Sequence, residues 1–177
     1  MLQRSLLVAV LASLALLPPA WSQARPAGGL SNNVLKNATY EAPWVAGGEM
    51  QLKEGRFDGV HATDPRIAVR TLLIGAPARG DLNGDGLPDA AVVLATSTGG
   101  QEVYYEVAAV LNDKGKPVHV ATAPIGDRIR FQWVNIRNGT IVVEFFAHGE
   151  KDPPCCPKAK TTRRFRLEPG GLREVSG

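Results

Sequence analysis

The chain has 177 residues, of which 44% are hydrophobic, 21% charged and 6% aromatic, and this composition excludes the disordered, collagen-like and coiled-coil classes. The 20 Lys and Arg residues against 17 Asp and Glu residues give a net charge of +3, which by itself does not indicate a nucleic-acid partner. The 19 glycines and 13 prolines favour short strands joined by many turns.

The N-terminal residues have the three regions of a secretory signal peptide. Arg4 precedes an apolar run at residues 6–17, and Ser22 and Ala24 are the small residues of a cleavage site. The apolar run is shorter than the ~20 residues that cross a bilayer, and no Cys for lipid attachment lies near the cleavage site. We predict that residues 1–24 are removed and that the protein is periplasmic or secreted, without a transmembrane segment.

Residues 25–48 are rich in Gly and Pro and are predicted to form an N-terminal arm with at most one helical turn, around residues 33–37. The remaining residues, 49–177, are predicted to form a β domain. Residues 90–95 are apolar on both faces of a strand, as expected for a central strand covered on both sides. In chain order, the expected strands are 51–54, 66–74, 90–95, 103–111, 118–125, 129–137, 140–147, 161–167 and 172–175.

The clearest local signal is a β-hairpin around Asn138 and Gly139. Asn-Gly supplies the two positive-φ residues of a type I′ turn. This turn places two apolar pairs opposite each other on one face, Ile136 with Ile141 and Val134 with Val143. The apolar phase changes between Trp133 and Val134, which indicates a β-bulge.

These elements predict a mainly β fold with a single antiparallel β domain, either a sandwich or a twisted meander, of about 7–9 short strands. The chain has no internal repeat, which argues against a propeller or a solenoid.

Residues 81–89 read DLNGDGLPD and predict a loop that binds Ca²⁺ in a structural role. Glycine at the sixth position permits the tight reversal, and three carboxylates within nine residues repel one another unless a cation lies between them. The expected ligands are the side chains of Asp81, Asn83, Asp85 and Asp89 and the carbonyl of Leu87. A solvated turn without an ion is the alternative.

This loop is not an EF-hand, because Val92 occupies the position of the bidentate Glu and an apolar strand follows. It resembles the calcium loops of integrin-α-type repeats, in which a similar run leads directly into a strand. That resemblance implies the same five ligands and applies to the loop alone, because integrin-type propellers carry several copies and this chain has one.

Cys155 and Cys156 are adjacent and are the two cysteines of the chain. An oxidising compartment favours a vicinal disulfide, which would be strained because neighbouring α-carbons are only about 3.8 Å apart. A copper or zinc site that also uses His148, and a redox switch, are the alternatives.

Two other features of the sequence are candidate functional sites. Residues 96–100 form a polar loop after the central strand, which would be the site of an envelope hydrolase, although the sequence around Ser97 has no nucleophile-elbow pattern. A basic stripe shares one face of the last long strand, and either faces solvent or contacts an anionic envelope surface. Its members are Lys158, Lys160, Arg164 and Arg166.

Five segments resemble a family of small exported bacterial proteins, and more distantly the LppP/LprE type of envelope lipoprotein: residues 35–40, 80–91, 108–112, 126–128 and 152–157. The resemblance implies no activity, and this chain lacks the lipidation Cys. We therefore expect an exported, non-catalytic binding or envelope-accessory module. Its partner would be an envelope ligand or protein and not a nucleic acid, and we expect a monomer.

Overall fold

The computed structural model describes residues 28–149, 152–153 and 156–176, so the predicted signal peptide lies outside the described residues. The elements in chain order are α1 (Asn32–Lys36), β1 (Thr39–Glu41), β2 (Glu49–Gln51), β3 (Arg56–Val60), β4 (Ala68–Gly80), β5 (Asp89–Ser97), β6 (Val103–Asp113), β7 (Lys116–Asp127), β8 (Arg130–Arg137), β9 (Thr140–Ala147), β10 (Ala159–Glu168) and β11 (Gly171–Glu174). None of the helices in the described part of the chain is long and apolar enough to cross a membrane.

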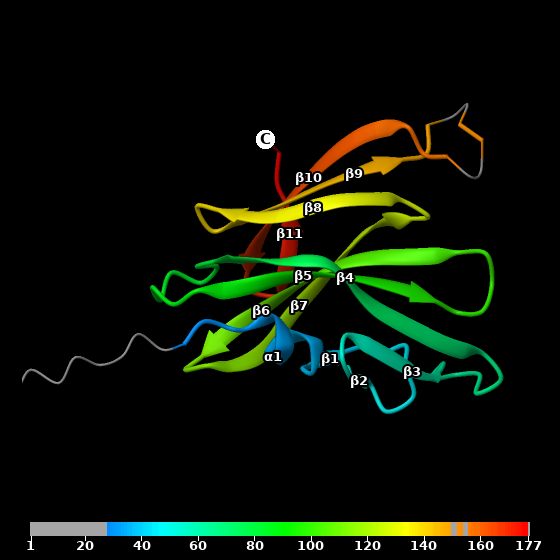
Figure 1. Ribbon diagram of the computed structural model, residues 1–177, viewed down its shortest axis with the longest axis horizontal. Coiled ribbons are helices and arrows are strands. Elements are labelled where there is room, and N and C mark those ends of the chain that lie inside the picture. The colour runs from blue at the N-terminus through cyan, green and yellow to red at the C-terminus, as the bar shows by residue number, and fades with distance from the viewer. Residues whose placement is uncertain (1–27, 150–151, 154–155, 177) are drawn as a thin grey trace, which may run out of the picture.

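The strands form three antiparallel layers (Figure 1). The middle layer is a five-stranded sheet with the order β3-β4-β5-β6-β7, and the upper layer is a four-stranded sheet with the order β11-β10-β9-β8. The small β1-β2 hairpin and α1 lie below the middle sheet. The two large sheets contact each other where β8 lies against β4 and β5 and where β11 lies against β7. The prediction of a single antiparallel β domain is confirmed.

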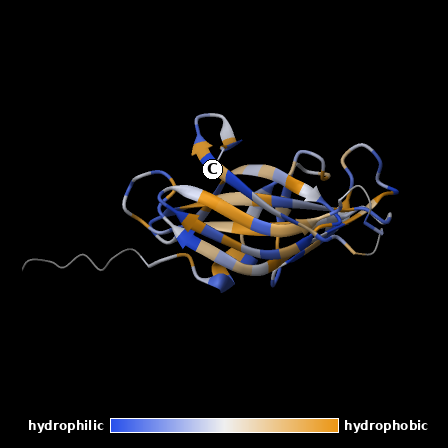
Figure 2. Ribbon diagram, turned by 90° about the horizontal axis from the view of Figure 1, so that it is seen from above, coloured by the Kyte–Doolittle hydropathy of each residue, from blue (hydrophilic) through white to orange (hydrophobic). Residues whose placement is uncertain are grey.

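Two hydrophobic cores lie on opposite faces of the five-stranded sheet, and β5 contributes to both. Ala91 and Val93 pack between the two large sheets, whereas Val92 and Leu94 pack against the N-terminal arm. All four side chains are at most 1% exposed. Apolar bands therefore run along the central strands in Figure 2, and the prediction that residues 90–95 are covered on both faces is confirmed.

The N-terminal arm packs closely on the sheet. The predicted helical turn occurs as α1, with the Ser31 hydroxyl accepting the Val34 N–H at its N-terminus. The sequence did not predict β1, in which Tyr40 is fully buried and donates its hydroxyl hydrogen to the Leu35 carbonyl at 2.9 Å. Because β1 has three residues, its alternation is too short to recognise as a period.

The β8–β9 hairpin forms around the predicted turn. Asn138 and Gly139 have φ of 49° and 70°, and the predicted pairs Ile136–Ile141 and Val134–Val143 are both observed. The irregularity in the register lies between Phe131 and Trp133, a little before the position expected from the sequence. Gln132 is the extra residue, and it restores the alternation so that Val134 faces the core.

Candidate ligand pocket and acidic loop

The acidic loop joins β4 to β5, and its own side chains hold its backbone. The Asp81 carboxylate accepts the N–H of Gly86 at 2.9 Å and of Gly84 at 2.6 Å, and these bonds, first that of Gly86, lower the pKa of Asp81. Both glycines have positive φ, which favours a residue without a Cβ. The Asp85 carboxylate accepts the Leu87 N–H at 2.7 Å, and the Asn83 side-chain oxygen accepts the Asp85 N–H at 3.0 Å.

Asp89 differs from the other loop carboxylates because it is fully buried. Its two oxygens accept the N–H of Leu82 at 2.8 Å and of Asn112 at 2.9 Å. Within the described residues, no group of three or more His, Cys, Asp or Glu side chains is placed to hold a metal ion. The oxygen donors of Asp81, Asn83 and Asp85 suit a hard cation chemically, and calcium binding at this loop stays a prediction.

The predicted cysteine pair lies partly outside the described residues. Cys156 is described, is exposed, and donates its backbone N–H to the Pro153 carbonyl at 3.0 Å. Cys155 is not described, so the vicinal disulfide and its alternatives stay predictions.

A cavity of about 340 Å³ lies at the end of β5 opposite to the acidic loop. It lies between the arm and the five-stranded sheet, on the face of the sheet that the arm covers. Strands β5, β6 and β7, the arm and the turn after β3 all contribute to it. The lining residues are Trp44, His61, Thr96, Thr98, Tyr104, Tyr105, Glu106, Pro124 and Gly126.

Glu106 is the carboxylate of this cavity. Its neighbours across the sheet are Leu94 on β5 and Pro124 on β7, and neither side chain can donate a hydrogen bond. Among the described residues, the Glu106 carboxylate has no hydrogen bond or ion pair. It is half-buried, and this burial raises its pKa.

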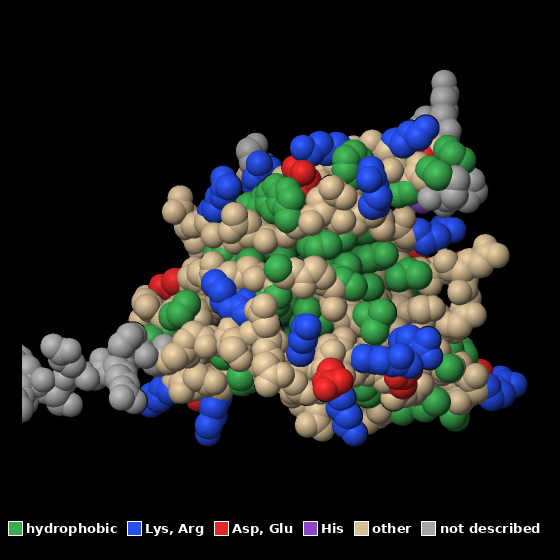
Figure 3. Space-filling view, in the orientation of Figure 1, with side chains coloured by type: hydrophobic (Ala, Val, Ile, Leu, Met, Phe, Trp, Pro, Cys, Tyr) green, Lys and Arg blue, Asp and Glu red, His purple; other side chains and the backbone are tan. Residues whose placement is uncertain are grey.

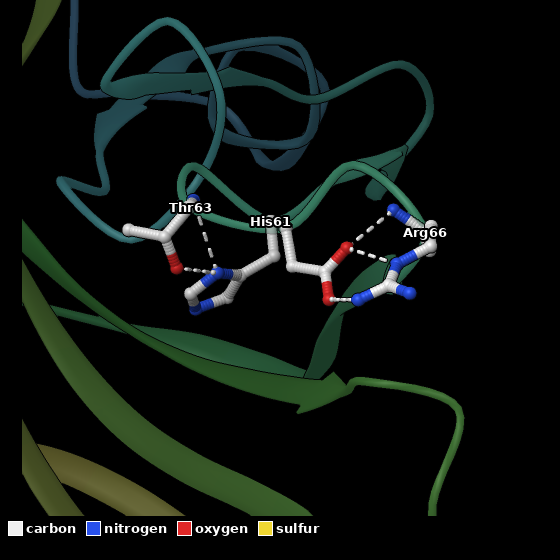
Figure 4. Close-up of polar contacts among 4 residues, drawn as sticks. His61, Thr63 and Arg66 are labelled. Carbon is white, nitrogen blue, oxygen red and sulfur yellow. Dashed lines mark hydrogen bonds and ion pairs between the residues drawn. The ribbon is translucent and has the colours of Figure 1, made fainter.

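His61 approaches the same cavity from a hydrogen-bonded turn (Figure 4). Its Nδ1 accepts the Thr63 N–H at 3.3 Å and lies 3.1 Å from the Thr63 hydroxyl. The Asp64 carboxylate closes the turn by accepting the Arg66 N–H at 3.0 Å and pairing with the Arg66 guanidinium at 2.8 Å. An accepting Nδ1 leaves the proton of a neutral ring on Nε2.

The cavity brings one sequence candidate, the loop at residues 96–100, close to a histidine and a carboxylate. However, the Thr96 hydroxyl is buried and lies 2.9 Å from the Thr71 hydroxyl, and the Ser97 oxygen accepts the Gly99 N–H at 3.4 Å. In the described chain, no hydrogen bond joins His61 to a hydroxyl of this loop or to Glu106. The residues are therefore near one another without forming a nucleophile and base pair.

Sequence reasoning did not identify Trp44, Tyr104 or Glu106 as site residues. The available signal was the alternation of the strand at 103–111, which turns Tyr104 and Glu106 away from its most apolar face. Nothing in the sequence shows that the arm reaches this face and adds Trp44.

Three members of the basic stripe, Lys160, Arg164 and Arg166, lie on the outer face of the four-stranded sheet, whereas Lys158 lies just before β10. Lys160 pairs with Glu144 at 3.1 Å, and Arg173 pairs with Glu168 at 2.9 Å. Four more arginines on this face have no carboxylate partner among the described residues: Arg130, Arg137, Arg164 and Arg166. Figure 3 shows Lys and Arg side chains gathered over this sheet, at the top of the view.

Comparison with known proteins gives a match to a family model over residues 87–170. No curated protein and no solved structure matches the chain. The matched segment contains β5 to β10. It therefore includes Glu106 and excludes the arm with Trp44 and the turn with His61. Over residues 87–170 the chain matches the family described as LppP/LprE lipoprotein, which supports a distant relationship to that family.

Proposed function

We propose that the protein is an exported, envelope-associated, non-catalytic module that binds a small ligand in the cavity between the arm and the five-stranded sheet. The observation that carries this proposal is the position of Glu106, a half-buried carboxylate without a partner among the described residues, inside an aromatic-lined cavity. The match to a lipoprotein family supports the envelope location.

The chemistry of the cavity agrees with a binding role. A volume of about 340 Å³ is within the range of small-ligand sites, which combine apolar walls with a few polar groups. Partial burial makes the charged form of a carboxylate less favourable when no partner compensates it. A ligand that hydrogen-bonds or pairs with Glu106 would remove this penalty.

The test is an NMR titration of the labelled protein with a library of cationic, anionic and neutral fragments. We expect at least one fragment to shift the amide resonances of Trp44, His61 and Tyr104. The Thr98→Trp variant, which fills the cavity, should abolish these shifts. Thr162→Trp, at an exposed position of β10, is the matched control and should retain them. A library in which no fragment shifts these resonances would contradict the proposal.

Calcium binding by the acidic loop is a second part of the proposal. The exposed side chains of Asn83 and Asp85 and the half-exposed Asp81 support it, and Leu87 and Asp89 would complete the ligand set. If free calcium were about ten times the dissociation constant, the ion would stabilise the fold by roughly 1.4 kcal/mol. Thermal unfolding with calcium, magnesium or a chelator tests this. An Asp85→Ala variant should lose the calcium response, and equal melting temperatures with calcium and with chelator would disprove it.

The basic outer face supports contact with an anionic envelope surface. Arginines without carboxylate partners attract anionic headgroups through an interaction that salt screens. We expect sedimentation with phosphatidylglycerol vesicles at low salt, little with phosphatidylcholine vesicles, and a reduced bound fraction for Arg164→Ala/Arg166→Ala. Equal binding to both vesicle types would reject this contact.

A further inference from the structure

We propose that the cavity selects an organic cation, a ligand with a quaternary or protonated amine, which Glu106 would hold together with the aromatic rings of Trp44 and Tyr104. This inference rests on the proposed binding function and specifies its ligand class.

The first argument is the charge of the cavity. Glu106 is the one carboxylate among the described residues that line it, and these lining residues contain no Lys or Arg. The side chains across the sheet from Glu106, Leu94 and Pro124, carry no charge. A cationic group is therefore the ligand feature that compensates the carboxylate best, because an anion would add a second negative charge in the same partly desolvated space.

The second argument is the placement of the aromatic residues. Tyr104 and Glu106 are two residues apart on β6, so they share one face of the strand. Trp44 reaches that face from the arm and is half-buried against its core. Aromatic ring faces attract cations, so the two rings add to the attraction that Glu106 exerts on a cationic group.

The third argument is that these groups are available to a ligand. Tyr104 is 48% exposed, and its hydroxyl, like the Trp44 indole N–H, has no hydrogen bond among the described residues. An exposed tyrosine beside an unpaired carboxylate and a tryptophan provides both electrostatic and ring contacts. Such a combination selects a cation over a neutral molecule of the same shape.

The experiment compares choline with its uncharged isostere 3,3-dimethylbutan-1-ol in NMR titrations that follow the resonances of the cavity residues. We expect choline to bind at least about tenfold more tightly, which corresponds to about 1.4 kcal/mol. In the Glu106→Gln variant this preference should fall below about twofold. The matched control is Glu102→Gln, which neutralises an exposed carboxylate in the preceding loop and should keep the preference. Thermal unfolding of each variant verifies that it is folded.

The outcomes separate this inference from the proposed function. Equal affinity for choline and the alcohol, or a preference unchanged in Glu106→Gln, would overturn the cation inference while the binding function stands. If other fragments bind the cavity and choline does not, the cation inference is likewise overturned while the binding function stands. A cavity that binds no compound of the fragment library would overturn both.

Discussion

The buried Asp89 carboxylate accepts the backbone N–H of Asn112 at 2.9 Å, which joins the start of β5 to the end of β6. Asn112 is also buried, and its side chain accepts the Gly115 N–H at 2.7 Å and donates to the Pro88 carbonyl at 3.2 Å. The acidic loop and the β6–β7 turn are therefore held together by one buried hydrogen-bond network.

Asp89→Ala should destabilise the protein by about 3 kcal/mol, because it leaves two N–H groups, those of Leu82 and Asn112, without an acceptor. Urea unfolding measures this change. In calcium-free buffer, Asp85→Ala should cost less than about 1 kcal/mol because Asp85 is exposed. Similar losses for the two variants would show that the buried network contributes little to stability.

Gly80→Ala should weaken the contact between β4 and β8. A Cβ at Gly80 would lie 2.5 Å from Cγ2 and 2.8 Å from Cβ of Ile136, so a side chain of the inter-sheet core must move. We expect a loss of about 2 kcal/mol in unfolding free energy. The double variant Gly80→Ala/Ile136→Ala should be more stable than the sum of the single changes predicts, since the truncated side chain removes part of the clash. Strict additivity would argue against the close approach.

Gly139→Ala should destabilise the β8–β9 hairpin by about 1 kcal/mol, because residue 139 has φ of 70° and other L-residues pay a penalty in that region. The added Cβ has space, with its nearest neighbour at 3.8 Å, so the loss comes from the backbone conformation. Gly28→Ala, where nothing lies within 4 Å, is the control and should leave the unfolding midpoint unchanged. An equal effect at both positions would contradict this explanation.

Lowering the pH should loosen the arm through His119. Its Nδ1 accepts the Glu41 N–H at 3.1 Å, and burial lowers the pKa of the ring below its usual value. A lowered folded-state pKa gives stability that is present above the unfolded pKa and is lost as pH falls through the folded pKa. Between about pH 7 and pH 5, the protection factor of the Glu41 amide, which corrects its exchange rate for the intrinsic pH dependence of amide exchange, should therefore fall as the ring becomes charged.

The non-titrating variant His119→Gln is the control for this pH effect. Its Glu41 amide should show a smaller fall in protection factor over the same pH interval. If the wild type and the variant respond equally, the pH sensitivity comes from another group.

Much of the fold could be predicted from local sequence patterns, as the β8–β9 hairpin and the helical turn at α1 show. Asn138 and Gly139 determine a turn type, and the turn determines which residues face each other, so Val134 and Val143 could be paired without any knowledge of the rest of the chain. The helical turn at α1 likewise depends on neighbouring residues, beginning with the Ser31 cap.

The candidate cavity could not be predicted in this way. Its groups come from segments far apart in the chain, from Trp44 in the arm to Gly126 in β7. The burial of Tyr40 could not be predicted either. Tyr40 is fully buried, but nothing in the neighbouring Gly- and Pro-rich sequence indicates this.

The sequence by itself determined the mainly β class, the central position of β5 and the register of the β8–β9 hairpin, because alternation and turn chemistry act over a few neighbouring residues. Tertiary structure alone decided that the arm covers one face of the five-stranded sheet, that Asp89 is buried in a hydrogen-bond network, and that Glu106 lies without a described partner in a cavity. The physical reason is that burial and pairing depend on which distant segments pack together, and in this protein those contacts join an N-terminal arm to strands that follow it by some tens of residues.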